Sequence, residues 1–405
     1  MDSLLEEHAR LTRRFFLQAL SAAGGSALLP AFARGQAPAM AYLTVQEMFG
    51  TVERGRPLPY TLPPDELAAA GLTRDTWRLE VVCDPEHPPR LARELRGATA
   101  FTFAALQEMA DRRAVRFLKT LTCANGVSPL GTGLWEGVPL RYVLFRTGLR
   151  SHCRRIFYHG FHNRDPRQIF RSSLPLDRVY EDPPGTPPII LAYKLNGEWL
   201  SGKRGGPVRL IVPESYGFKS VKWLSRIILS NRSTSNDTYA QYNNTTESWM
   251  KTFARFATRP ERIRAGEPIP LSGVAQVGTS GLRHVQYWIV PGEPEPAERE
   301  PFFLDAPWST AEILGPPTDW GGRLPATDNP SNGSPRALGF NADGPAEWPM
   351  RFAVAHWAAV APPQRPGRYT VFCRTVDDNR VAQPWPRPLQ NSGRNLLDRF
   401  VLEVT

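Results

Sequence analysis

A single cysteine stands where an apolar run gives way to a loop of small residues. The stretch LKTLTCANGVSPLGTG, residues 118–133, places Cys123 directly before Ala-Asn-Gly, and a proline and two more glycines follow. A thiol in such a loop could serve as a nucleophile or a metal ligand, because its thiolate form can do either. It could also be a small buried hydrophobe, as many unpaired cysteines are. The loop by itself leaves these interpretations open.

The other cysteines and the histidines support few alternative chemistries. Cys83, Cys153 and Cys373 lie far apart in the sequence, and no CxxC or CxxCH occurs. This spacing excludes zinc ribbons, thioredoxin-type redox pairs and covalently attached c-type haem. The closest histidines are His159 and His162, and without HExxH they give little support to a conventional histidine metal site. A Cys-His nucleophile that uses either of them as base has no supporting motif.

The composition favours a strand-rich, soluble protein. The chain of 405 residues is long enough for two domains, and its 40 prolines and 32 glycines predict many turns and few long helices. The net charge of +10 is spread among acidic residues without a dense basic block, so we expect no nucleic-acid partner. Attraction for an anionic cofactor or substrate explains the charge as well.

The first residues resemble an export signal. Arg13 and Arg14 precede an apolar stretch that ends in Ala31-Phe32-Ala33. This pattern predicts a twin-arginine signal peptide over residues 1–33, with cleavage after Ala33 and a periplasmic protein as the product. The apolar part is short for a spanning helix, and we expect no transmembrane segment in the mature chain.

The elements that must position these residues differ between two parts of the chain. In the first part, strands are expected over 77–82, 115–123, 207–213 and 221–230, a hairpin over 188–200, and helices over 101–115 and 138–149. From about residue 260 the chain becomes short alternating runs between turn residues, which is typical of a β-sandwich. The sequence therefore predicts an α+β domain over residues 34–259 and an immunoglobulin-like β-sandwich over residues 260–405.

Several segments, in order, resemble one family. The Cys-Ala-Asn-Gly stretch is followed by SSLPLDRV (172–179), LAYKLNGEWL (191–200) and GGPVRLIVPESYGFKSVKWLSRI (205–227). Together they are similar to the molybdenum-binding segments of sulfite oxidase-like enzymes. The resemblance implies a mixed α/β molybdopterin-binding domain, followed by an immunoglobulin-like domain that pairs two subunits. It also implies a cofactor, Mo-molybdopterin, in which one pyranopterin dithiolene and one cysteine thiolate hold the metal.

The resemblance assigns roles to particular residues. Cys123 stands at the position of the metal-ligating, catalytic cysteine, and a thiolate suits such a metal. Arg209 and Lys222 stand at cationic contacts to the pterin phosphate; without the ordered motif, an arginine there could be a surface charge. Further cofactor contacts are expected from Arg54, Arg56, His162, Asp165, Arg204, Ser220 and Trp223, and the active-site tyrosine corresponds to Tyr239 or Tyr242.

One departure from the family pattern concerns the substrate. Sulfite oxidases carry an arginine shortly after the cysteine, whereas Val127 and Ser128 stand there in this chain. The expected reaction is oxygen-atom transfer to sulfite or a related sulfur oxyanion, with electrons passed to a separate partner such as a c-type cytochrome or a quinone-linked membrane protein. Reduction of a sulfoxide-type substrate on the same cofactor is one alternative. A cofactor-free exported binding protein is another.

Overall fold

The structure is a computed structural model, and most of the chain after residue 41 can be described. The described residues are 42–53, 56–124, 128–161, 169–235, 246–297, 303–317, 320, 335–342, 344–383 and 396–405. The predicted signal peptide lies outside these ranges, as do Arg54, His162, Asp165, Tyr239 and Tyr242. No helix within the described residues is long and apolar enough to cross a membrane.

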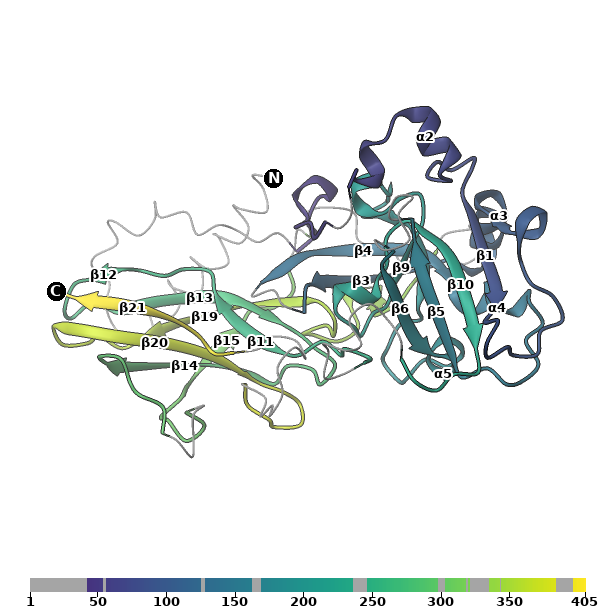
Figure 1. Ribbon diagram of the computed structural model, residues 1–405. Helices are drawn as coiled ribbons and strands as arrows, with labels where there is room; N and C mark the ends of the chain where they lie inside the picture. The colour runs from purple at the N-terminus through teal and green to yellow at the C-terminus, as the bar shows by residue number, and fades with distance from the viewer. Residues whose placement is uncertain are drawn as a thin grey trace.

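A five-stranded sheet occupies one end of the molecule (Figure 1). Its strands are, in spatial order, β2 (Phe101–Thr102), β1 (Arg78–Cys83), β10 (Leu224–Ser230), β5 (Arg155–Gly160) and β6 (Arg171–Pro175). β1 runs parallel to β10 and the other pairs are antiparallel. Apolar side chains on alternate positions, such as Leu79 and Val81, enter the largest core, because successive strand residues point to opposite faces.

A second sheet carries the cysteine loop. Its strands are β16 (Arg336–Ala337), β3 (Val115–Thr122), β4 (Pro129–Pro139), β7 (Ile190–Leu195) and β8 (Glu198–Trp199), with β9 (Arg209–Ile211) on β7. β7 and β8 form the predicted hairpin, and Asn196 and Gly197 both adopt positive φ, as a tight hairpin turn requires. The predicted strands around Cys123 and Arg209 are thus confirmed.

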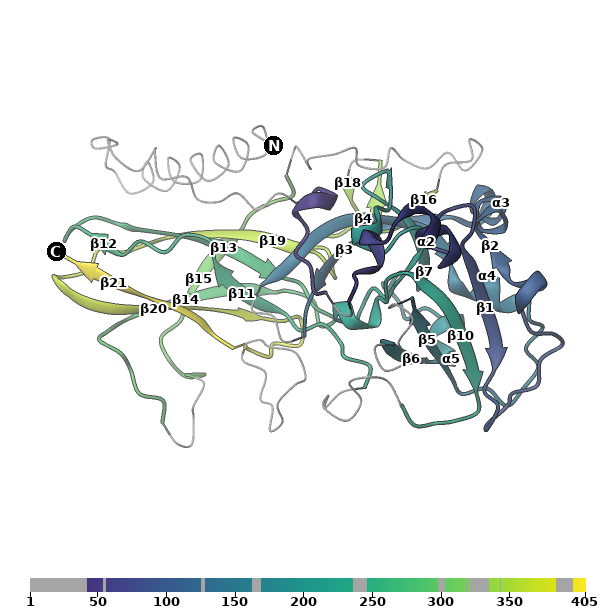
Figure 2. The same cartoon turned by 45° about the horizontal axis from the view of Figure 1, so that its top comes forward.

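The helices are short, and the α-helices all lie at the end of the molecule that holds the five-stranded sheet (Figure 2). Thr102 caps the helix that follows it, since its hydroxyl accepts a hydrogen bond from the Ala105 amide at 3.1 Å. The α-helices are α2 (Pro64–Ala69), α3 (Phe103–Arg113), α4 (Leu140–Phe145) and α5 (Leu176–Tyr180). The 3-10 turns are η2 (Gln46–Met48), η3 (Pro59–Thr61), η4 (Gly97–Thr99), η6 (Gly202–Arg204) and η7 (Gly217–Lys219).

An eight-stranded sheet occupies the other end of the molecule, where the chain terminates (Figure 1). Its core combines residues from several strands, among them Trp357, Val371 and Leu402. The strands are, in order, β11 (Phe253–Phe256), β13 (Ile269–Gln276), β19 (Val354–Ala361), β15 (Ser309–Ile313), β14 (His284–Pro291), β20 (Gly367–Val376), β21 (Asp398–Val404) and β12 (Arg262–Ile263). A separate hairpin joins β17 (Phe340–Asn341) and β18 (Gly344–Pro345).

The described chain is therefore mostly sheet with few helices. The immunoglobulin-like class and the boundary between residues 259 and 260 stay predictions. The sheets do not divide strictly at that boundary. β11 precedes residue 260 but belongs to the eight-stranded sheet, and β16 follows it but pairs with β3 of the second sheet.

Packed side chains join the eight-stranded sheet to the cysteine strand. Leu118 of β3 and Leu134 of β4 share one core cluster with Val274 and Val354. The backbone amide of Thr120 donates to the Phe352 carbonyl at 2.6 Å. Strand β3 is consequently held against the eight-stranded sheet before it reaches the cysteine.

Candidate functional site

Cys123 lies at the end of β3, just beyond its last paired residue. Its thiol is half-buried, and within the described residues it is not part of a disulfide. The neighbouring Thr122 donates through its hydroxyl to the Gln276 side-chain oxygen of β13. On another side, a Cβ added to Gly217 would lie 3.3 Å from the Thr122 carbonyl oxygen, so η7 packs closely on this strand end. The cysteine backbone is therefore held by two other elements.

Arg209 begins β9 and is almost completely buried, with 4% of its surface exposed. Its guanidinium lies 5.2 Å from the centre of the Trp135 ring, and it donates to the carbonyl oxygens of Arg204 and Ser220 at 2.9 and 2.6 Å. Burial and then the charge of Arg204 lower the pKa of Arg209 to about 9. The interpretation of Arg209 as a surface charge is thereby excluded.

Arg204 is a second buried arginine in the same cluster. It lies in η6, and its guanidinium donates to the Phe49 carbonyl at 3.0 Å and to the Thr51 hydroxyl at 2.5 Å. Burial lowers its pKa. Through these bonds Arg204 holds residues 49–51, in the segment that leads to Arg56.

Lys222 supplies the third cation. Its amine donates to the Lys203 carbonyl at 3.1 Å, and burial, followed by the charges of Arg209 and Arg204, lowers its pKa to about 7. A Cβ on Gly205 would lie 2.7 Å from the Lys222 Cβ, and Gly205 has a φ of +97°. Glycine is therefore required where η6 passes over Lys222.

Trp223 and Ser220 brace this cluster. The Trp223 indole donates to the Gly202 carbonyl at 2.8 Å, and its ring stacks on Tyr60 with centroids 6.4 Å apart. The Ser220 hydroxyl accepts a hydrogen bond from the Val212 amide at 3.1 Å. Both predicted cofactor contacts therefore have partners within the protein that hold the strand and turn in place.

Arg56 lies at the rim, with 74% of its side chain exposed. It is 3.5 Å from the carboxylate of Glu53, and that carboxylate accepts a hydrogen bond from the Tyr60 hydroxyl at 2.5 Å. The Tyr60 hydrogen bond is the main cause of a lowered pKa for Glu53. A negative charge thus already stands beside the cations, on the solvent side.

We call Arg204, Arg209 and Lys222 the cationic cradle. Among the described residues, the Nε atoms of Arg204 and Arg209 are buried and find no hydrogen-bond partner. No carboxylate among the described residues forms an ion pair with any of the three. Buried cations that repel one another are costly unless an anion neutralises them. A phosphate group has the charge and the acceptor atoms that these guanidinium and ammonium groups lack.

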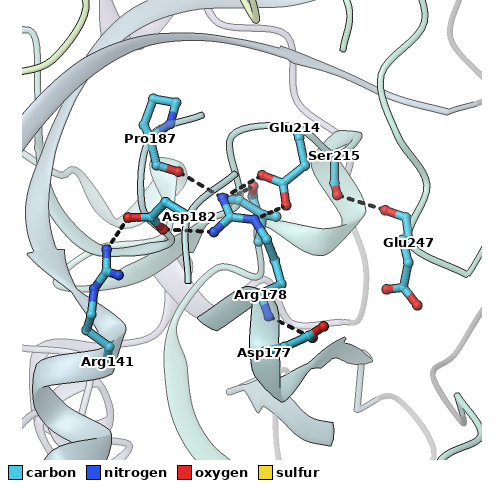
Figure 3. A network of polar contacts seen from close by, with 10 residues as sticks. Arg141, Asp177, Arg178, Asp182, Pro187, Glu214, Ser215 and Glu247 are labelled. Carbon is cyan, nitrogen blue, oxygen red and sulfur yellow. Dashed lines mark hydrogen bonds and ion pairs between the residues drawn. The ribbon is translucent and has the colours of Figure 1, made fainter. Parts of the chain in front are cut away.

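A second group of buried charges was not found from the sequence (Figure 3). Arg178 of α5 donates to both carboxylate oxygens of Glu214 at 2.8 and 3.0 Å. It also donates to Asp182 at 3.0 Å and to the Pro187 carbonyl at 2.8 Å, while Arg141 contacts Asp182 from the other side. We call these four charged residues the paired network. Its members lie in different elements, and their sequence spacing gives no signal of the pairing.

Lys119 was also missed. It lies fully buried on β3, where its amine donates to the Ser215 carbonyl at 3.0 Å and contacts the Met250 sulfur. Burial lowers its pKa to about 7, against the opposing charge of Glu214. Because Ser215 follows Glu214, the hydrogen bond from Lys119 connects the paired network to β3. The Ser215 hydroxyl also donates to the Glu247 carbonyl at 2.7 Å (Figure 3). The only sign of this buried amine in the sequence is an isolated lysine within an apolar strand.

The structure thus brings together most of the described residues that the sequence singled out. Arg204, Arg209, Ser220, Lys222 and Trp223 form one cluster. Cys123 lies on a different strand and approaches the same chain segment at η7, a few residues before Ser220. The roles assigned to all these side chains, and to the residues outside the described ranges, stay predictions.

Comparison with known proteins identifies the domain that contains this cluster. The model of the oxidoreductase molybdopterin binding domain matches residues 67–239. A nitrate reductase [NAD(P)H] from Betula pendula is 38% identical over 130 residues, which are 31% of this chain and 14% of the relative. Mitochondrial sulfite oxidase from Drosophila melanogaster is 29% identical over 206 residues, 50% of this chain and 33% of the relative. The chain thus matches a third or less of these relatives' lengths.

A solved structure shares the fold over nearly the whole chain. The sulfane dehydrogenase SoxCD from Paracoccus pantotrophus superposes with a TM-score of 0.57 over 93% of both chains, at 18% identity. The matched domain binds molybdopterin, whose phosphate has the charge that the cationic cradle requires. Residues 67–239 therefore form an oxidoreductase molybdopterin binding domain, and the comparisons together support a sulfite oxidase-like family of molybdopterin oxidoreductases.

Proposed function

We propose that this oxidoreductase transfers an oxygen atom to a sulfur oxyanion, with sulfite as the first substrate to test. The observation that carries the proposal is the cationic cradle, whose buried Arg204 and Arg209 keep unpartnered donor atoms. The cysteine at the end of β3 supplies the thiolate that such a cofactor's metal accepts. The matched relative named sulfite oxidase supports sulfur as the reacting element.

Each part of the site has a separate task in this proposal. When bound, molybdopterin supplies two-electron redox chemistry and an exchangeable oxygen atom. Arg204, Arg209 and Lys222 would hold its phosphate, and Arg209 can do so with directed donors whereas Lys222 acts as a point charge. Cys123 would hold the metal, with its backbone fixed through Thr122.

The substrate pocket should be poorer in cations than that of a sulfite oxidase. Val127 and Ser128 replace the arginine that the family places after the cysteine. A hydrogen bond to a charged group is worth about 1.5–3 kcal/mol, so a dianion should bind more weakly by that amount. This observation favours a second candidate, in which the protein reduces a neutral sulfoxide-type substrate.

Two assays separate the candidates. Sulfite-dependent reduction of a c-type cytochrome is expected for the first, and sulfoxide-dependent oxidation of a reduced viologen dye for the second. The variant Cys123→Ser should fold and should lose turnover in whichever assay the wild type supports. Full activity of that variant would exclude the cysteine from the site. Cofactor loading must be verified in both proteins before the rates are compared.

We further propose export and assembly for this chain. The twin arginines and the small residues that follow support a periplasmic protein, whose electrons would pass to a separate cytochrome or a quinone-linked membrane protein. Replacing Arg13 and Arg14 by lysine should leave the protein in the cytoplasm. Residues 34–259 would form the cofactor domain and residues 260–405 an immunoglobulin-like domain that pairs two subunits, which sedimentation of the full chain would test.

A cofactor-free binding protein is disfavoured. A protein without an anionic cofactor gains nothing from burying Arg204 and Arg209 side by side without a carboxylate, because their mutual repulsion lowers stability. A colourless preparation without molybdenum, made in a host with verified pyranopterin supply, would reverse this judgement.

A further inference from the structure

Two cysteines lie at one edge of the five-stranded sheet, on opposite sides of β10. Cys83 is the last residue of β1, and its Cα pairs with that of Leu229 in β10. On the other side, the Arg154 amide donates to the Ser230 carbonyl at 2.8 Å, which places Cys153 beside the end of β10. Because Leu229 and Ser230 are consecutive, both cysteines adjoin the same peptide unit.

The two side chains also share a face of the sheet. Cys83 follows Val81 by two residues on β1, so both point to the same side. Val81 is a member of the largest core, and Cys153 packs against that same core from its periphery. Both thiols therefore lie on the core face of the sheet, at its partly exposed edge.

The segments that carry the cysteines are tied together independently of β10. Arg90 and Ser151 form an antiparallel bridge, with the Arg90 amide 2.9 Å from the Ser151 carbonyl. The Cys83 sulfur lies 4.0 Å from the carbonyl oxygen of Pro89, the residue before this bridge. The segment after β1 thus lies directly on the segment that leads to Cys153.

The electrostatics agree with this proximity. Burial raises the pKa of Cys153 to about 11; a Ser230 backbone hydrogen bond opposes this, and Cys83 adds to the increase. Burial, followed by the Glu94 carboxylate, raises the pKa of Cys83. Both groups are therefore thiols at neutral pH, and their exchange reactions should be slow there and faster in alkali.

We propose that Cys83 and Cys153 form a disulfide when the protein meets a small-molecule disulfide such as oxidised glutathione. One cysteine thiolate attacks the glutathione disulfide and releases one glutathione thiol. The second cysteine then attacks the mixed disulfide, forms the Cys83–Cys153 bond and releases the second glutathione. Each cysteine thiol gives up its proton, and the two protons end on the two glutathione thiols. The cysteines lose two electrons, which reduce the glutathione disulfide.

The bond would connect elements that are distant in sequence, and it would not involve the metal site. It would hold the end of β1 to the segment before β5 and restrict the unfolded chain, which is how disulfides stabilise proteins. The proposed export would bring the pair into a compartment where disulfides persist. The inference does not depend on the proposed reaction, because Cys123 lies on another strand.

The test uses the full chain with oxidised glutathione at alkaline pH. Unreacted thiols are labelled under denaturing conditions, and peptides are mapped by mass spectrometry. We expect a peptide pair joined through Cys83 and Cys153, with Cys123 and Cys373 still labelled, and a higher unfolding midpoint than in the reduced protein. Cys83→Ser and Cys153→Ser are matched controls, and each should lose both the bridge and the increase in midpoint.

The proposal fails if the folded protein keeps all four thiols under conditions that oxidise a reference dithiol. It also fails if Cys83 and Cys153 end only as separate glutathione adducts, or if either of them pairs with Cys123 instead. A bridge that forms only after unfolding would equally contradict it, because the native strand arrangement is what brings the cysteines together.

Discussion

The paired network and the cationic cradle both contain largely buried arginine, but only in the paired network do carboxylates neutralise its charge. Arg178 donates to both oxygens of Glu214 and to Asp182, so its charge is neutralised within the protein. Arg209 donates only to carbonyl oxygens, lies near Arg204 and keeps a buried Nε without a partner among the described residues. The first arrangement stabilises the fold, whereas the second is completed by an anion from outside the chain.

The largest expected effect is on the paired network. Arg178→Leu would leave the buried carboxylate of Glu214 without its partner, and breaking such a pair costs about 3–5 kcal/mol. Chemical denaturation of the cofactor-free protein should show this loss in the free energy of unfolding. A loss below about 1 kcal/mol, the usual value of an exposed pair, would mean that the network is not a structural unit.

The matching change in the cationic cradle should behave differently. Arg209→Met removes a charge that has no carboxylate partner, so the stability of the cofactor-free protein should stay the same or rise. Cofactor retention should fall by about 1.5–3 kcal/mol, the value of a charge-assisted contact, which is roughly ten- to a hundredfold in affinity. Phosphate and molybdenum analysis after dialysis measures this. If Arg209→Met keeps the cofactor as well as the wild type but loses stability, Arg209 is a structural residue like Arg178 and the contrast between the two groups is wrong.

Two lysines, the fully buried Lys119 and the half-buried Lys222, predict a pH dependence of stability. Burial lowers the pKa of both Lys119 and Lys222 from 10.5 to about 7, so between these values the unfolded chain binds more protons than the folded one. The stability of the cofactor-free protein should therefore rise as the pH increases from 7 towards 10, and the full penalty should remain below 7. Lys119→Met should weaken this rise in denaturation curves recorded across that range. If the slope of the unfolding free energy against pH is unchanged in Lys119→Met, groups other than Lys119 cause the rise in stability.

The smallest effect is expected at the rim of the cradle. Arg56→Gln removes an exposed cation whose partner, Glu53, faces solvent and keeps its hydrogen bond from Tyr60. Neither the unfolding midpoint nor cofactor retention should change measurably, because exposed pairs are screened by water and salt. A loss of cofactor comparable to that of Arg209→Met would instead make Arg56 a cofactor contact, as the sequence predicts.

Sequence and structure agree where local pattern decides the outcome. The hairpin predicted over residues 188–200 and the helix predicted over residues 101–115 follow from residues that are neighbours in the chain, and both are confirmed. The ordered motif also identified Arg209 and Lys222, which the structure places in one cluster.

Long-range pairings could not be anticipated in the same way. The sequence indicates that Arg178 and Glu214 are charged, but only the packing of α5 beside the turn after β9 brings them together. Lys119 sits in an apolar strand, and nothing local indicates that its amine reaches the Ser215 carbonyl. The approach of Cys83 to Cys153 likewise depends on β10, a strand that lies far from both in the sequence.

The most direct test of the account is the metal and phosphate content of the protein purified from a host that makes pyranopterin. Elemental mass spectrometry should find about one molybdenum and one phosphate per chain, released together on denaturation. Arg209→Met should lower both values in parallel, while the wild type keeps them through dialysis. A wild-type protein with neither element, made with verified cofactor supply, would contradict the claim that the cationic cradle is built for molybdopterin.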